Sequence, residues 1–150
     1  MTAKGTALVD RVIQALETIT GANGFNTDAG SRVVRGRAES LKIEAGGLPM
    51  ISVSTTANTN DATKPRAVRK LREIEIVGLV DASAEDYEPA MDLLDEDIAL
   101  ALAPLVSIDA MPGTMSVELA GGDYQHPDGG SKIAGVVHTI TVSYSLTRQQ

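Results

Sequence analysis

The sequence predicts an α+β fold in which two helices pack on a mixed, mainly antiparallel β-sheet. Two segments carry apolar residues at helical spacing, and several others are β-branched or alternate with the period of two that is typical of strands. The elements follow the order α-β-β-β-α-β-β, which favours a sheet with helices packed on it. At 150 residues the chain has the length of one ordinary domain, and we expect a single domain over 1–150.

The first predicted helix spans about residues 6–20. Val12, Leu16 and Ile19 belong to an apolar stripe with spacings of three and four, and polar side chains occupy the opposite side. Gly21 follows at a position where a glycine often ends a helix in the left-handed conformation. This pattern predicts one buried face and one solvated face.

Three strands are predicted next, at 32–37, 50–55 and 72–80, because these segments are rich in β-branched and aliphatic residues. The segment 56–70 has almost no apolar content before residue 68, and we expect a long hairpin loop there. Loops of this length in compact domains are usually binding elements or disordered.

The second predicted helix has two possible starts. Either Ser83 caps it, with Asp86 at the capping-box position, or Glu88 precedes Pro89 as the first helical residue. The helix stops before Pro104. Its apolar stripe has regular helical spacing and consists of Tyr87, Met91, Leu94, Ile98 and Leu102.

Two further strands are predicted at 115–119 and 133–146. In the longer one, apolar residues alternate with serine and threonine, which predicts one face on a core and one polar face. The glycine-rich segment 120–131 between them is predicted as a second long loop. We expect both long loops to reach onto neighbouring proteins, because ordering such insertions is costly without a partner.

Composition argues against several classes of function. Aromatic residues make up only 3% of the chain, too few for a platform that stacks nucleic-acid bases. The absence of cysteine removes disulfides, thiolate zinc sites and cysteine nucleophiles. No apolar run approaches the roughly 20 residues that span a bilayer. We therefore expect a soluble protein with an aliphatic core and no membrane partner.

The evidence for catalysis or metal binding is weak. His138 lies on the apolar face of the last strand, which predicts a core or interface histidine. His126 stands near Asp123 and Asp128, but one histidine with two loop carboxylates is a poor set of metal ligands. No serine occupies a nucleophile elbow, and the glycine pairs match no phosphate-binding loop. We expect a protein that is not an enzyme and needs no cofactor.

Charge is unevenly distributed along the chain. Residues 1–72 carry a net charge of +5, and residues 73–150 carry −12. This asymmetry fits solvated faces, head-to-tail self-association or a nucleic-acid arm. The acidic residues at 85–97 are predicted to form a solvated helix face.

Two leucines of the second helix, Leu93 and Leu100, lie about 140° from its core stripe, at about 100° per residue. Either they touch another part of the same chain, or another subunit covers them. Together with residues of the two predicted loops they form the candidate interface: Leu93, Leu100, Lys64, Arg66, Arg69, Lys70, Asp123, Tyr124, His126 and Asp128.

Six segments share their order, spacing and residue types with a known family. They are ALVDRVIQAL (7–16), RVVRGR (32–37), LPMISV (48–53), REIEIVGLV (72–80), DLLDEDI (92–98) and PDGGS (127–131), followed by an alternating last strand. In this the chain resembles the tail terminator proteins of long-tailed bacteriophages, the family of lambda-like minor tail protein U.

The resemblance implies a virion component that forms a hexameric ring at the head-proximal end of the tail tube. Such a ring stops tube polymerisation and presents a surface to the head-completion or stopper protein. The implied partners are copies of the chain itself, the tail tube protein and that head protein, and assembly takes place in the host cytoplasm. The alternatives are another head–tail joining or tail-completion subunit, or a monomeric binding module.

DNA would pass through the lumen of such a ring without specific binding. We expect acidic residues of 73–150 to line the channel, because basic residues would bind the phosphate backbone tightly. The basic half of the chain would then face outward or toward a neighbouring subunit.

Overall fold

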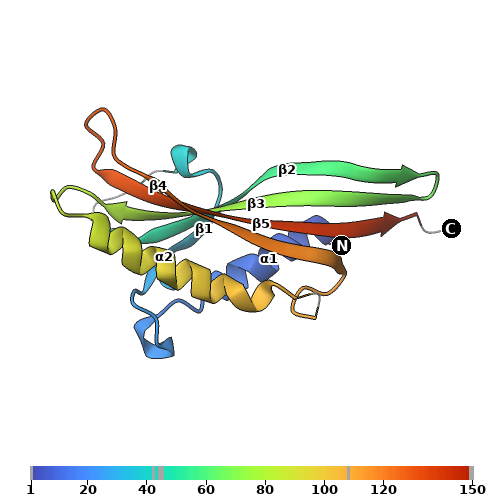
Figure 1. The fold of residues 1–150 in the computed structure, drawn as a ribbon, viewed down its shortest axis with the longest axis horizontal. Coiled ribbons are helices and arrows are strands. Elements are labelled where there is room, and N and C mark those ends of the chain that lie inside the picture. The colour runs from blue at the N-terminus through green and yellow to red at the C-terminus, as the bar shows by residue number, and fades with distance from the viewer. Residues whose placement is uncertain (1, 42, 44–45, 108, 149–150) are drawn as a thin grey trace.

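A computed structural model describes residues 2–41, 43, 46–107 and 109–148. One five-stranded sheet in the order β1-β2-β3-β5-β4 carries two helices on one face (Figure 1). β1 runs parallel to β2, and the other neighbouring strands are antiparallel. The predicted fold class and element order are therefore confirmed. The elements are α1 (Lys4–Leu16), β1 (Val33–Arg35), β2 (Met50–Lys64), β3 (Ala67–Asp81), α2 (Glu88–Leu102), β4 (Thr114–Gln125) and β5 (Ile133–Thr147), with 3-10 turns at Gly21–Asn23, Ala29–Arg32, Ala38–Ser40 and Ala103–Leu105.

The first helix is shorter than the sequence predicted. It ends at Leu16, and Glu17 is its C-terminal cap with a helical backbone. Gly21 does not cap this helix but begins a separate 3-10 turn, which Gly24 ends with a φ of 87°. Ile19 stays fully buried even though it lies beyond the helix, which is why the apolar pattern extends past the helical residues.

The second helix begins as the proline alternative predicted. Glu88 is its first residue and Pro89 lies in its first turn, with Tyr87 as the N-cap. Ser83 lies in the turn before the helix, where its backbone N–H donates to Asp81 Oδ1 (2.9 Å). The predicted stripe packs on the sheet, with Met91, Leu94, Ile98 and Leu102 fully buried. Within the described ranges, neither helix combines the length and apolar character needed to cross a bilayer.

The core lies between the helices and one face of the sheet. Alternate residues of the central strands point into it, including Ile74 and Ile76 of β3 and Ile140 and Val142 of β5. A smaller cluster on the opposite face is built on Met50, Val77 and Leu79, against which Leu41, Ile43 and Leu48 of the 38–48 connection pack. The second face of the sheet is thus covered at one end by a connection instead of a helix.

The predicted long loop at 56–70 is wrong, because the segment is part of a continuous hairpin. β2 runs to Lys64, a two-residue turn follows, and β3 starts at Ala67. β5 pairs with β3 out to the tip and provides a third strand. We call this projecting part, residues 56–71 and 143–147, the arm (Figure 1). The side chains of this hairpin are exposed or half-buried over most of its length. The segment 56–70 therefore tolerates polar residues and lacks an apolar pattern.

The second predicted long loop, at 120–131, is largely strand as well. β4 continues to Gln125, which leaves a turn over 126–132. Gly121 has a φ of 136°, and the register with β5 shifts between Gly121 and Asp123. A Cβ at Gly121 would lie 2.5 Å from His138 Cα, so this glycine marks a β-bulge in close contact with its neighbour strand.

The close packing of α2 on the sheet gives a testable prediction. A Cβ at Gly78 would lie 2.7 Å from Ile98 Cδ1 and 2.8 Å from Leu94 Cδ2. We expect Gly78→Ala to lower the free energy of unfolding by about 1–3 kcal/mol, because overpacking a filled core displaces its side chains. Urea denaturation followed by circular dichroism measures the change. The matched control is Gly135→Ala on β5, whose Cβ would meet side chains at an ordinary 3.4 Å. Equal losses in both variants would contradict the packing argument.

Candidate functional site

The four basic candidates of 56–70 lie toward the tip of the arm. Lys64 and Arg66 are exposed at the turn, and the Arg148 backbone N–H donates to the Arg66 carbonyl oxygen (2.8 Å), which brings a further cation to the tip. Lys70 Nζ donates to Asn60 Oδ1 across the hairpin (2.7 Å). Within the described part of the chain, no acidic side chain lies in ion-pair distance of Lys64 or Arg66. The tip therefore presents cations to its surroundings.

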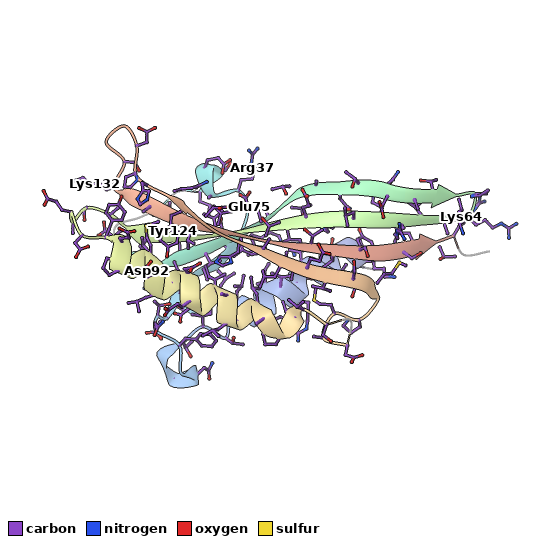
Figure 2. All side chains as sticks on the ribbon, in the orientation of Figure 1. Arg37, Lys64, Glu75, Asp92, Tyr124 and Lys132 are labelled. Atoms are coloured by element: carbon purple, nitrogen blue, oxygen red, sulfur yellow. The ribbon has the colours of Figure 1, made fainter. Side chains whose placement is uncertain are left out.

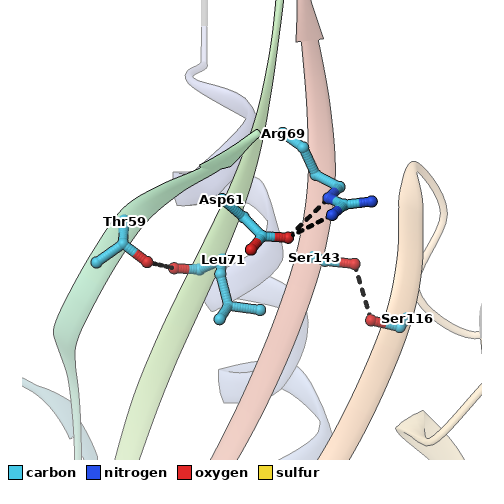
Figure 3. A network of polar contacts seen from close by, with 6 residues as sticks. All are labelled: Thr59, Asp61, Arg69, Leu71, Ser116 and Ser143. Atoms are coloured by element: carbon cyan, nitrogen blue, oxygen red, sulfur yellow. Dashed lines mark hydrogen bonds and ion pairs between the residues drawn. The ribbon is translucent and has the colours of Figure 1, made fainter. Parts of the chain in front are cut away.

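The fourth cation, Arg69, is paired within the arm. Its guanidinium lies 2.7 Å from Asp61 Oδ2, and both side chains are less than half exposed (Figure 3). Nearby, the hydroxyl groups of Ser116 and Ser143 share a hydrogen bond (2.8 Å) that links β4 to β5 (Figure 3). Such cross-strand polar contacts help to order the arm, which extends beyond the apolar core.

Tyr124 and His126 are two candidates of the second predicted loop. They hold the β4–β5 hairpin against α2 and its N-cap. The Tyr124 hydroxyl donates to Asp92 Oδ1 (2.5 Å), and His126 Nδ1 lies 2.7 Å from the Tyr87 hydroxyl oxygen. The His126 and Tyr87 rings meet edge to face. Burial raises the pKa of Tyr124 above its usual range, and the hydrogen bond to the Asp92 carboxylate raises it further.

The remaining two candidates, Asp123 and Asp128, are exposed at the same end of the molecule. We call this end, which also carries Lys132, the acidic end. The labelled Lys64 lies at the opposite end of the long axis from Tyr124 and Lys132 (Figure 2). The structure therefore does not gather the candidates of the two predicted loops into one site. The acidic end contains Asp81, Glu85, Asp86, Glu88, Asp92, Asp123 and Asp128.

Leu93 and Leu100 are 44% and 65% exposed, so the described residues leave a large part of both side chains open to solvent. Whether another subunit covers them, the second alternative from the sequence, stays a prediction. Leu93 borders a mainly apolar groove of about 230 Å³ between α2 and the sheet. We call it the α2 groove; its lining residues are Thr27, Leu48, Pro49, Val80, Asp81, Ala90 and Leu93.

His138 is a core histidine, as predicted. It is 5% exposed, and its Nε2 lies 2.7 Å from Asp95 Oδ1 on α2. This contact ties the helix to the central strand β5. His126, in contrast, has a tyrosine as its partner. Among the described residues, no three histidine, aspartate or glutamate side chains converge as a metal site.

The acidic run at 85–97 predicted a solvated position for Asp97. This prediction is wrong. Asp97 is 1% exposed and accepts hydrogen bonds from the backbone N–H groups of Asn26 (2.9 Å) and Thr27 (2.8 Å) and from the Thr27 hydroxyl (2.8 Å). A signal for this position was present: Asp97 lies three residues after Leu94 and four before Ala101, both buried. It anchors the chain after α1 beside the outer leucines of α2.

This anchor gives a second prediction. Asp97→Ala should lower the free energy of unfolding by about 1–3 kcal/mol, because it leaves three part-buried donors of Asn26 and Thr27 without their carboxylate acceptor. Glu96→Ala, at the exposed neighbouring position, should change it by less than about 0.5 kcal/mol. Urea denaturation of the two variants measures the difference. Similar stabilities would show that the carboxylate does not hold this segment.

Comparison with known proteins gives a similar fold and no family. No family model matches the sequence, and no curated protein does. Among solved structures, a chain described as "Virion of native gene transfer agent (GTA) particle" is similar, with a TM-score of 0.59 and 14% sequence identity. The similarity covers 97% of this chain and 100% of that chain. At this identity, the likeness establishes a common fold.

Proposed function

We propose that this protein is a non-enzymatic structural component of a phage-like virion. The observation that carries the proposal is the fold match, which extends over 97% of this chain and the whole of a chain from a gene transfer agent virion. The resemblance of the sequence to tail terminators supports the same class of protein.

Within that class, we propose a hexameric ring at the head-proximal end of the tail tube. Charges of opposite sign lie at the two ends of the elongated subunit, with Lys64 and Arg66 at the arm tip and the acidic end opposite (Figure 2). Head-to-tail contacts between unlike surfaces close into rings when the rotation between copies allows it. Complementary potentials favour this register over head-to-head contacts.

The open sheet edges support an assembling subunit as well. β1 pairs with β2 only over residues 51–53, so 54–64 of β2 form an edge, and β4 forms the other edge. Exposed edges offer unpaired backbone groups to another chain. A ring built from such subunits would occupy the end of the tail tube, stop its polymerisation and offer its other surface to the head-completion or stopper protein.

The face of the sheet opposite the helices, beyond the part covered by the 38–48 connection, suits the passage of DNA. Glu73 and Glu75 of β3 lie in register with Thr141 and Thr139 of β5, and Glu118 of β4 also pairs with Thr141. We propose that this face of carboxylates and hydroxyls lines the channel, where it would repel the phosphate backbone and avoid tight binding. Assembled rings with a basic channel wall would contradict this placement.

A related role, as another head–tail joining or tail-completion subunit, would use the same surfaces. The similar chain is described only as part of a virion, so the two roles differ in the position of the ring. In either role, the protein belongs to the tail region of the virion and assembles in the host cytoplasm.

Electron microscopy of particles tests the proposal. We expect the purified protein to form rings on tube ends. Tails made in its absence should vary in length and lack heads, because tube growth is not stopped. The control is the same preparation with the wild-type protein added back, which should restore uniform, head-bearing tails. Uniform capped tails without this protein would contradict a terminator role.

A further inference from the structure

We propose that the arm tip of one copy docks in the α2 groove of the next copy. This inference rests on the proposed ring and specifies which two surfaces meet in it. The occupant of the groove is thus a second copy of this chain. Chemical complementarity between tip and groove carries the argument.

The tip combines an apolar pair with cations. Val68 of β3 and Leu146 of β5 are register partners, and Leu146 is 41% exposed. Lys64, Arg66 and Arg148 line the same shallow concavity around this pair. An aliphatic pair with one exposed and one half-buried member, surrounded by three cations, is typical of a contact surface that needs an apolar, acidic counterpart.

The α2 groove has the matching chemistry. Its lining is almost wholly apolar, with Asp81 as its one ionisable lining group. Glu96 is exposed on α2 three residues after Leu93, and the acidic end adjoins the groove through Asp81. One cation also reaches the rim, since Arg32 Nη1 donates to the Pro49 carbonyl oxygen (3.4 Å). The surrounding charge is nevertheless predominantly negative.

The two surfaces cannot meet within one molecule. The arm tip lies at one end of the long axis, and the N-terminal half of α2 lies toward the other (Figures 1 and 2). Contact between tip and groove must therefore join different copies, and each copy has one of each surface free. Such a contact is heterologous, and repeated contacts build a ring or an open filament.

Disulfide trapping tests this contact directly, because the chain has no cysteine of its own. A variant with both Arg66→Cys and Leu93→Cys should form, on mild oxidation, a ladder of linked copies on a non-reducing gel. Each single variant should give dimers at most. The matched control combines Arg66→Cys with Gln14→Cys, which places the second cysteine at an exposed position of α1. This control should give no ladder.

Charge exchange provides an independent variant set. Lys64→Glu with Arg66→Glu should weaken self-association at least about tenfold in sedimentation velocity, since close charge pairs across interfaces couple by more than 1.4 kcal/mol. Adding Asp81→Lys and Glu96→Lys to that variant should restore association. Circular dichroism verifies that each variant is folded.

The outcomes separate this inference from the proposed function. Rings that form without a ladder from the 66–93 pair would overturn the docking and leave the ring role standing. A ladder of equal strength from the 66–14 control would overturn it too. If neither rings nor ladders form on tube ends, both the docking and the ring role fail.

Discussion

The central constraint on this structure is that the sheet is longer than the helices that cover it. α1 and α2 bury one face of its inner part, where aliphatic side chains of β3 and β5 alternate into the core. α1 reaches only the base of the arm, where Gly5 lies close to the buried Tyr144, and in the described part of the chain no helix covers the arm tip (Figure 1). Hydrophobic burial contributes little beyond Tyr144, so the backbone ladder with β5 and cross-strand polar pairs order the outer part of the arm. An uncovered strand edge and a cationic tip follow from this geometry, and both are surfaces suited to contact with another molecule.

Buried polar groups fix the position of α2, and with it the acidic end and the α2 groove. Asp95 holds His138 of β5, and Asp97 holds the backbone at Asn26 and Thr27. A charge or imidazole removed from water is tolerated where hydrogen bonds replace its hydration. These contacts fix the position of α2 relative to both the sheet and the segment after α1.

The parts of the fold that the sequence predicts are those where burial imposes a period. The stripe of α2 and the alternation of β5 were predictable because one face of each element contacts the core. The part of the arm at 56–71 was not predictable, because its side chains are mostly exposed or half-buried and show no apolar period. The contacts of Asp97, Tyr124 and His126 depend on segments distant in sequence, so residue type alone could not reveal them. The position of Leu93 and Leu100 away from the core stripe was predictable, because it depends only on local helix geometry, and both side chains are exposed in the structure.

Amide hydrogen exchange at the open edge of β2, before and after ring assembly, tests the central claim most directly. If copies assemble through the uncovered part of the sheet, amides within 54–64 that face solvent in the free subunit will become protected in the ring. Assembly that leaves exchange along this edge and at the arm tip unchanged would show that the subunits meet through other surfaces.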